Sequence, residues 1–320
     1  MKRRDFIKTT AMVAPMISMF PADLSAISRE SQPGKIEKRS LGKTGEMLSM
    51  IGFGGIIVMD ATPEDSSVLV KLAIDSGINY FDVAPTYGDA EVKLGPALEP
   101  YRKGVFLACK TTERDRDGSR KELEQSLKHL RTDHVDLYQF HAVTTPEDVE
   151  QIFATGGAME TYLEARKEGK IRFIGFSAHS VEAAMAMMDR FDFDTILFPV
   201  NYVTWNKGNF GPQVLQKAHE KNMGILALKS MAKGPWPKDA DKTEYPKCWY
   251  QPLISPEDIK MGLSFTLSHS VTAALTPGDQ RLFRAALSVS GSVKPLNDSE
   301  IAGIKEKAMA GVPLFKFPRT

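Results

Sequence analysis

Short apolar runs alternate along the chain with longer segments in which apolar residues recur every three or four positions. The runs are typical of buried parallel strands, and the periodic segments are typical of amphipathic helices. The runs predict strands at residues 50–57, 79–84, 105–110, 135–141, 171–177, 195–201, 224–230 and 271–276. Helices are predicted at residues 66–75, 121–130, 159–168, 181–190, 213–221, 256–268 and 298–310. Eight such units with right-handed crossovers predict an α/β fold, a closed (β/α)8 TIM barrel.

The length and composition of the chain fit a single domain. A chain of 320 residues with 42% hydrophobic residues buries a large core, and barrels of this size commonly form one domain. Residues 235–256 follow the seventh predicted strand and are rich in proline, lysine and tryptophan. Such an insertion is either a lid over a functional site or a surface excursion. In the same way, Trp205, Trp236 and Trp249 either line a pocket or anchor loops.

Charge and cysteine content argue against several classes of function. The 41 basic and 40 acidic side chains leave a formal charge of +1, so no overall field attracts nucleic acid or an anionic membrane. Cys109 and Cys248 are too few for a disulfide framework or a cysteine-ligated cluster. One bridge between them is open in an oxidising compartment, but Cys109 lies in an apolar run, where we expect it to pack. The sequence predicts neither a nucleic-acid partner nor a metal site.

The first residues differ from the rest of the chain. The sequence KRRDFIK at residues 2–8 precedes an uncharged, mostly apolar run at residues 9–20 and then small residues up to Ala26. This pattern resembles a twin-arginine export signal, and the run is shorter than the roughly 20 residues that span a bilayer. The alternative is a basic N-terminus without a targeting role. We expect a signal at 1–26, a barrel at 27–320, and an exported, periplasmic protein with no membrane anchor after signal removal.

Four polar residues stand at the ends of three consecutive predicted strands. Asp82 and Tyr87 close the second strand, Lys110 closes the third, and His141 closes the fourth. Singly, each has a structural explanation: a loop cap, a packed rim residue, a solvated strand end and a buried histidine. In a barrel, however, the carboxyl ends of the strands meet at one face, which is where active sites form. Together, the four residues indicate a proton-transfer site.

The four residue types suit the reduction of a carbonyl group by hydride transfer. Hydride addition builds negative charge on oxygen, and Tyr87 can donate the proton that neutralises this charge. A nearby Lys110 is expected to lower the ordinary tyrosine pKa of about 10, and Asp82 to keep the lysine charged and oriented. His141 is expected to donate a hydrogen bond to the substrate oxygen. The pattern predicts Tyr87 as the general acid/base.

Three motifs resemble the aldo-keto reductase family. They are FDVAPTYG at residues 81–88, DLYQFH at residues 136–141 and GKIRFIGFS at residues 169–177, and the resemblance runs from about residue 39 to about residue 286. It implies a TIM barrel, a nicotinamide cofactor bound without a Rossmann glycine motif, and the same four catalytic residues. The substrate implied is a small carbonyl compound, such as an aldehyde, ketone or sugar, or its alcohol.

The family's contacts to the nicotinamide carry over only in part. Ser177 matches a serine that contacts the carboxamide, but the asparagine usually found next is absent. His179 or Asn201 is the candidate replacement for the missing amide contacts. Lys229 stands where the family has an aromatic residue that stacks on the nicotinamide, and it either meets a phosphate or is a solvated loop residue. Ser230 after it matches the family.

The phosphate side of the cofactor is expected near the eighth strand. Gly278 belongs to a Pro-Gly loop that resembles the family's and leads into a helix, a suitable place for a phosphate. Arg281 and Arg284 are candidates for a 2′-phosphate and favour NADP(H) over NAD(H), although Asp279 would repel that group. Gly54 after the first strand allows close approach of cofactor or substrate, or serves a tight turn.

The sequence leaves three functions open. The first is an active NAD(P)-dependent oxidoreductase. The second is an exported cofactor-binding accessory or sensor protein with little turnover, because family resemblance does not guarantee activity. The third is a barrel without the nicotinamide cofactor, acting as a lyase or sugar-modifying enzyme. Because free NADPH is not expected outside the cytoplasm, we expect an exported enzyme to carry its nucleotide tightly bound and to cycle between two substrates or use an unidentified redox partner.

Overall fold

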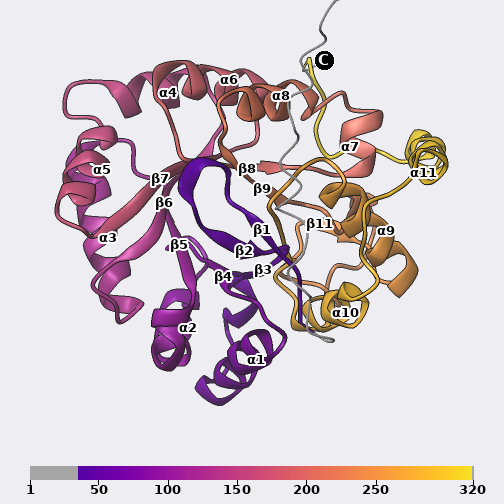
Figure 1. Ribbon diagram of the computed structural model, residues 1–320, viewed down its shortest axis with the longest axis horizontal. Coiled ribbons are helices and arrows are strands. Elements are labelled where there is room, and N and C mark those ends of the chain that lie inside the picture. The colour runs from indigo at the N-terminus through magenta and orange to yellow at the C-terminus, as the bar shows by residue number, and fades with distance from the viewer. Residues whose placement is uncertain (1–34, 319–320) are drawn as a thin grey trace, which may run out of the picture.

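Eight parallel strands close into a barrel inside a ring of helices (Figure 1). The structure, a computed structural model, describes residues 35–318. The barrel strands are β3 (Ile51–Gly54), β4 (Tyr80–Asp82), β5 (Phe106–Thr111), β6 (Val135–Val143), β7 (Ile171–Ala178), β8 (Thr195–Pro199), β9 (Gly224–Leu228) and β12 (Ala273–Leu275). All eight predicted strands are confirmed, and with them the TIM barrel. The predicted export signal at 1–26 lies outside the described residues.

Helices follow the strands and cover the outside of the barrel. They are α1 (Pro63–Asp75), α2 (Ala90–Leu98), α3 (Arg116–His129), α4 (Pro146–Phe153), α5 (Ala158–Lys167), α6 (Val181–Arg190), α7 (Tyr202–Asn206), α8 (Pro212–Glu220), α9 (Pro256–Leu267), α10 (Gln280–Ser290) and α11 (Asp298–Ala310), with 3-10 turns at Gly42–Thr44, Gly55–Val58 and Glu99–Gly104. Starts are well capped: the Thr62 side chain accepts a hydrogen bond from the Asp65 backbone at 3.0 Å. The seven predicted helices are present. The periodic pattern missed α2, α4 and α7, which are short, and α2 contains Pro96. It also missed α10, where a helix was expected only from the Pro-Gly loop before it.

A hairpin that was not predicted closes the N-terminal end of the barrel. Strands β1 (Lys38–Ser40) and β2 (Met47–Ser49) pair antiparallel and lie across the barrel axis (Figure 1). Leu41 and Leu48 are fully buried in one cluster with inward-facing barrel residues such as Tyr80 and Leu137. The polar stretch before the first barrel strand hid this hairpin, because its two strands have only three residues each.

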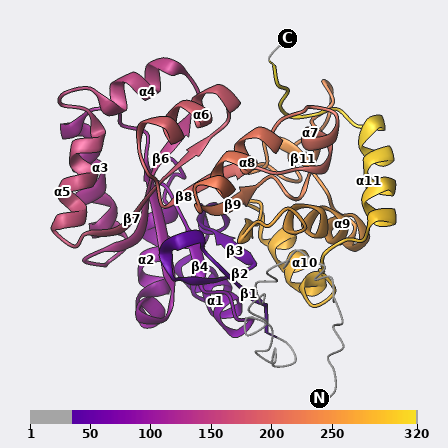
Figure 2. The ribbon, with the colours of Figure 1, turned by 45° about the horizontal axis from the view of Figure 1, so that its top comes forward.

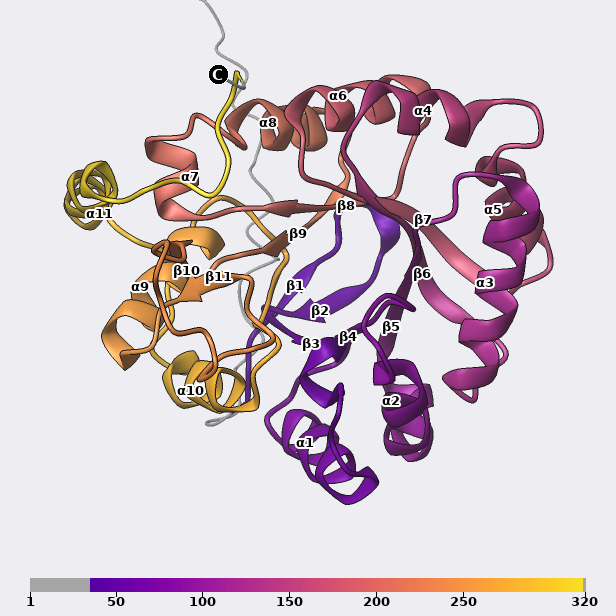
Figure 3. The ribbon, with the colours of Figure 1, turned by 180° about the vertical axis from the view of Figure 1, so that it is seen from behind.

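A second hairpin stands at the opposite, C-terminal end. Strands β10 (Ala232–Pro235) and β11 (Tyr250–Pro252) pair antiparallel and hold the insertion after β9 between them (Figure 3). The insertion is therefore an ordered extension of the barrel rather than a domain boundary. It lies at the end of the barrel where the parallel strands finish.

The last part of the chain returns to that same C-terminal end. Helix α11 packs outside the ring against α7 and α9 (Figure 2). The segment after it then runs back over α7, where the Phe317 backbone N–H donates to the Gly208 carbonyl at 2.8 Å. Among residues 35–318, no helix is both long and apolar enough to cross a membrane.

Candidate active site

A buried lysine joins the second and third barrel strands at their carboxyl ends. Lys110 on β5 is 1% exposed and forms an ion pair with Asp82, the last residue of β4. Its ammonium group also donates to the Val83 carbonyl at 3.2 Å and lies 3.5 Å from the Tyr87 hydroxyl. Lys110 is therefore not a solvated strand end. It connects the carboxylate and the phenol, as the sequence predicted.

Two further residues hold the second oxygen of Asp82. The Tyr80 hydroxyl donates to Oδ2 at 3.2 Å, and the Gln139 side-chain amide donates to the same atom at 3.0 Å. Both residues are buried on barrel strands. Neither residue was predicted for the site, although a glutamine inside a buried apolar strand is an available signal, because buried polar groups need partners. These two bonds fix the carboxylate for Lys110.

His141 faces the tyrosine from β6. Its ring centroid lies 5.9 Å from that of Tyr87 in an edge arrangement, and a 3.4 Å hydrogen bond joins its Nδ1 to the Thr86 hydroxyl. Arg114 donates to the His141 carbonyl at 2.7 Å. Burial and the nearby positive charges, of which Lys110 is the largest, lower the pKa of His141 to about 3. The imidazole is thus neutral at physiological pH.

The pKa values of Lys110 and Tyr87 depend on the balance between burial and the charges nearby. Burial disfavours the charged form of Lys110, but Asp82 and Tyr87 together raise the pKa of this lysine above its ordinary value. For Tyr87, burial is the largest effect and outweighs the influence of Lys110, so the pKa of the phenol is raised. The expected lowering of the Tyr87 pKa is therefore wrong in direction. The phenol is protonated at neutral pH.

These residues open into one small cavity of about 210 Å³ at the C-terminal end of the barrel. Nine of the predicted site residues line it: Gly54, Asp82, Tyr87, Lys110, His141, Ser177, His179, Lys229 and Gly278. Other lining residues come from the insertion, namely Lys247, Trp249 and Tyr250. The insertion is thus a wall of the site rather than a surface excursion.

The remaining predicted cofactor residues lie outside the lining of this cavity. Asn201 is 2% exposed, and its side chain accepts from the backbone N–H groups of Val203 and Thr204. Its amide donates to the carbonyls of Lys229 and Ala232 at 3.2 and 2.6 Å. Its oxygen therefore caps the start of α7 and its amide holds the turn after β9, so the idea that it replaces a carboxamide contact is corrected.

Two serines differ in how they are bonded. The Ser177 hydroxyl accepts from the Ala142 backbone N–H at 2.8 Å and lines the cavity. The Ser230 hydroxyl is fully buried and has no hydrogen-bond partner within the described chain. His179 also lines the cavity, and burial together with the charge of Lys229 lowers its pKa to about 4. His179 is therefore a second neutral imidazole in the site.

The glycines at the site are explained by packing. A Cβ atom on Gly54 would lie 2.8 Å from the Thr276 carbonyl oxygen, and one on Gly278 would lie 2.6 Å from the Ile56 side chain. Both distances are far below van der Waals contact. These two residues let the ends of β3 and β12 approach each other.

Arg281 and Arg284 lie on the first turns of α10 and are exposed. Arg281 forms a 2.9 Å ion pair with Asp279, which caps the helix, and stacks over Tyr245 at 4.5 Å. The charge of Asp279 is thus neutralised by Arg281, which weakens the repulsion of a 2′-phosphate that was expected from Asp279. Arg284 has no ion pair within residues 35–318.

The three tryptophans divide between the two roles considered. Trp236 donates to the Cys248 carbonyl at 2.8 Å and anchors the insertion, and Trp205 packs against His269. Trp249 lines the cavity and is 56% exposed. Phe315 from the C-terminal segment contacts the rings of both Trp249 and His179, at centroid distances of 6.1 and 5.4 Å. The C-terminal segment therefore borders the cavity.

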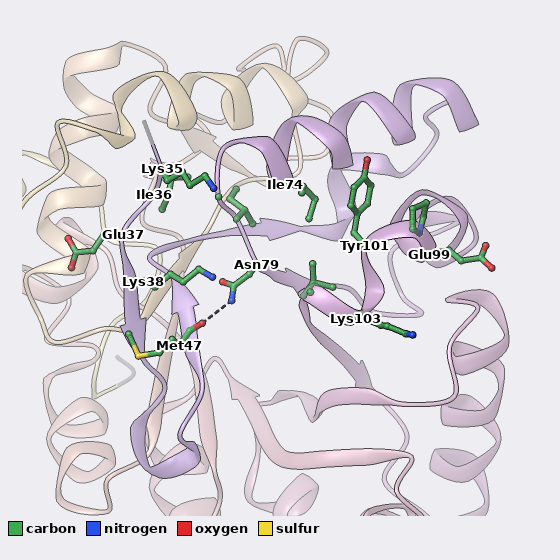
Figure 4. A pocket seen from close by; sticks show the side chains of 15 residues that line it. Lys35, Ile36, Glu37, Lys38, Met47, Ile74, Asn79, Glu99, Tyr101 and Lys103 are labelled. Carbon is green, nitrogen blue, oxygen red and sulfur yellow. Dashed lines mark hydrogen bonds between the residues drawn. The ribbon is translucent and has the colours of Figure 1, made fainter. Parts of the chain in front are cut away.

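A larger hollow of about 920 Å³ lies at the other end of the barrel (Figure 4). It is bordered by the β1–β2 hairpin and the residues before β4 and β5, and there Asn79 donates to the Met47 carbonyl at 2.8 Å. Lysines and glutamates are mixed along its rim. It lies away from the strand ends that carry the acid, amine, phenol and imidazole, so size alone does not locate the active site.

Metal and disulfide chemistry find no support in residues 35–318. Cys109 and Cys248 are both buried and unbridged. No group of three or more metal-ligating side chains occurs within that range.

Comparison with known proteins places this site in a family. The model of the Aldo/keto reductase family matches residues 50–251, which include all four strand-end residues. L-galactose dehydrogenase of Arabidopsis thaliana is 26% identical over 216 residues, 62% of this chain and 67% of that protein. Aldo-keto reductase YhdN of Bacillus subtilis is 32% identical over 218 residues. These residues are 62% of this chain and 63% of that protein, which is less than two thirds of its length.

A solved structure extends the likeness to almost the whole fold. Aldo-keto reductase AKR11C1 from Bacillus halodurans, in its holo form, superposes with a TM-score of 0.69 and 19% identity, covering 89% of this chain and 99% of that chain. At this identity the likeness concerns the fold alone. The family model, however, spans most of the chain and includes the residues that meet in the cavity. This chain therefore belongs to the aldo/keto reductase family of oxidoreductases.

Proposed function

We propose that this protein interconverts a small carbonyl compound and its alcohol by hydride transfer with an NAD(P) cofactor, and that Tyr87 is its general acid/base. The observation that carries the proposal is the buried contact of Lys110 with both Asp82 and Tyr87. Even a paired buried charge gives up its hydration, so a buried ion pair adds little stability compared with apolar side chains of the same size. Hydride transfer to a carbonyl gives it a chemical use.

The protonation states favour reduction. The raised pKa of Tyr87 keeps the phenol protonated, ready to donate to the oxygen that gains negative charge. The ammonium group of Lys110, 3.5 Å away, stabilises the phenolate left behind. The neutral imidazole of His141 orients the carbonyl oxygen by a hydrogen bond. A bound nicotinamide nucleotide supplies the hydride.

The surroundings of the cavity are suited to such a nucleotide. The buried Ser230 hydroxyl lacks a partner within the described chain, as expected for a group that bonds to a ligand. Ser177 and His179 would hold the nicotinamide end. The loop before α10 and the unpaired Arg284 would hold the phosphate end, because a helix N-terminus favours anions. A cation at Arg284 favours NADP(H) over NAD(H).

The substrate class is proposed from the size of the cavity and from the family. The substrate shares a cavity of about 210 Å³ with the nicotinamide end of the cofactor, which favours an aldehyde, a ketone or one sugar ring over a polymer. One relative, L-galactose dehydrogenase, is named for a sugar. We therefore include sugars among the candidate substrates.

Nucleotide binding and a single hydroxyl deletion test the proposal. The dissociation constants of NADPH and NADH are measured by fluorescence titration, and turnover is measured on a panel of aldehydes with the native chain and Tyr87→Phe. We expect NADPH to bind more tightly than NADH, and the variant to lose activity at least about 100-fold. Tyr101→Phe removes a hydroxyl near the opposite hollow and serves as the control.

Each outcome has a distinct meaning. Binding without turnover on any aldehyde would favour the cofactor-binding accessory or sensor. Failure to bind either nucleotide would refute the oxidoreductase. Full activity of Tyr87→Phe would remove that residue from its role while leaving the reaction in place.

Export is a separate proposal that rests on residues 1–26 alone. We propose that the twin-arginine route carries the folded protein, with its nucleotide, to the periplasm. Cell fractionation of the full chain and of the Arg3→Lys/Arg4→Lys variant tests this. Retention of the variant in the cytoplasm supports the proposal, whereas equal distribution of both proteins refutes it.

A further inference from the structure

Lys229 is a cation inside the catalytic cavity that lacks an acidic partner. Its ammonium group lies 4.9 Å from the ring centroids of both Trp249 and Tyr250. Within residues 35–318 this group makes no ion pair and no hydrogen bond. The two rings stabilise the charge but do not neutralise it. Lys229 is partly buried in the cavity, and a cation held away from water without an acid beside it favours a negatively charged partner, which we expect a ligand to supply.

The charge of the whole cavity points the same way. Its titratable lining groups include three lysines and one acid, Asp82, which is already paired with Lys110. The lowered pKa values leave His141 and His179 neutral. Burial, together with the charge of Lys110, lowers the pKa of Lys229 to about 8, so this lysine is still mostly charged at pH 7. Three positive charges and one negative charge then give the lining a net charge close to +2. A ligand that carries negative charge is therefore favoured there.

The backbone of Lys229 is held in a strained conformation. Its φ angle is +68°, in the left-handed region that non-glycine residues rarely adopt. The Asn201 amide donates to the Lys229 carbonyl at 3.2 Å, and the Ala232 N–H donates to the same atom at 3.0 Å. Such strain persists where surrounding bonds fix it, and it concentrates at ligand sites. The turn thus presents the lysine to the cavity at an energetic cost.

We propose that Lys229 binds the anionic group of the substrate, and that the substrate is a small carbonyl compound bearing a carboxylate. The inference rests on the proposed function and narrows its substrate class. Lys229 shares the cavity with Tyr87 and His141, and its charge is felt by both imidazoles. The candidate phosphate residues lie instead on α10. A carboxylate at Lys229 leaves the carbonyl of the same small molecule within reach of the phenol.

A matched pair of aldehydes tests the proposal. We compare kcat/KM for 4-carboxybenzaldehyde and 4-formylbenzamide, which have similar shape but differ in charge, with saturating NADPH. The Lys229→Met variant removes the charge, and Lys229→Arg keeps it. Lys233→Met removes a charge from an exposed position on β10, four residues after Lys229, and serves as the control.

We expect the native chain to prefer the carboxylate. The ratio of the two kcat/KM values falls about 10- to 100-fold in Lys229→Met, stays within about 3-fold in Lys229→Arg, and is unchanged in Lys233→Met. An unchanged ratio in Lys229→Met would overturn the proposal. Equal loss on both aldehydes with a weaker dissociation constant for NADPH would also overturn it, because Lys229 would then bind the nucleotide.

A binding measurement separates this proposal from the proposed reaction. Benzoate and benzamide are titrated calorimetrically into the native chain and Lys229→Met, with no nucleotide and no turnover. Preference for benzoate that is lost in the variant supports the anion site even when no aldehyde is reduced. Equal binding of both compounds by the native chain refutes the anion site even when aldehydes are reduced.

Discussion

Replacing Lys110 with methionine removes the ammonium group that connects the acid to the phenol. Methionine is of similar length and keeps the site apolar, so the change is mainly one of charge. Asp82 then remains buried with a negative charge and two donors, the Tyr80 hydroxyl and the Gln139 amide. These donors satisfy hydrogen bonds but do not neutralise the carboxylate. The variant thus isolates the effect of an unpaired buried charge.

The expected loss of stability follows from the burial of the pair. Breaking a buried pair by removing one partner costs about 3–5 kcal/mol, and the two remaining donors place this case near about 3 kcal/mol. Since the entropy of unfolding is about 2.1 cal/mol/K per residue, that loss lowers the melting temperature of a chain of this length by about 5 °C. The double variant Lys110→Met/Asp82→Asn leaves no charge behind. It should recover at least about 2 kcal/mol relative to the single variant, because the two changes are strongly coupled.

Urea unfolding followed by circular dichroism gives the free energies, and aldehyde reduction gives the activities. Both variants should lose turnover, since neither retains the ammonium group beside Tyr87. A single variant less than about 1 kcal/mol below the native chain would refute the reasoning about the buried charge. So would a double variant whose loss of unfolding free energy equals the sum of the losses measured for Lys110→Met alone and Asp82→Asn alone.

Three further changes probe the same end of the barrel. The unfolded chain takes up a proton at His141 below about pH 6.5, but the folded chain does so only near pH 3, so the native chain loses stability between pH 7 and pH 4. The drop in its unfolding free energy over that range should exceed the drop in His141→Gln by about 2–3 kcal/mol. Equal drops in the two proteins would contradict the lowered pKa. Asn201→Ala frees the turn at Lys229 and should cost about 2–3 kcal/mol in urea unfolding, with a loss under about 0.5 kcal/mol speaking against that role. In Gly278→Ala the new methyl group would clash with the Ile56 side chain and should lower the free energy of unfolding by about 1–3 kcal/mol. Most of that loss should be recovered when Ile56→Ala is added, and no recovery would exclude the clash.

The barrel could be predicted because its signal is repeated and local. Each of the eight strands carries its own apolar run, and errors in one do not affect the others. The β1–β2 hairpin could not be predicted in this way, because Leu41 and Leu48 are buried by strands distant in the sequence. Periodicity within three-residue strands carries too little information to reveal such contacts.

The site was predictable in its membership more than in its energetics. The strand ends located the acid, phenol, amine and imidazole that meet in the cavity. The direction of the Tyr87 pKa depends on how completely the ring is buried, which the order of residues does not encode. Asn201 shows the same limit: its type suits a ligand contact, but two of its four hydrogen bonds cap α7 and the other two hold the turn after β9.

The two ends of the described chain differ in their distance from the chemistry, and this affects how the protein can be handled. Lys35 lies beside the hollow at the N-terminal end of the barrel, opposite the catalytic cavity (Figure 4). Phe315 touches Trp249 and His179 at the border of that cavity. An affinity tag or surface attachment placed ahead of Lys35 leaves the entrance open to substrate. An addition at the carboxyl terminus follows closely on the segment that borders the entrance, so we expect it to raise measured KM values.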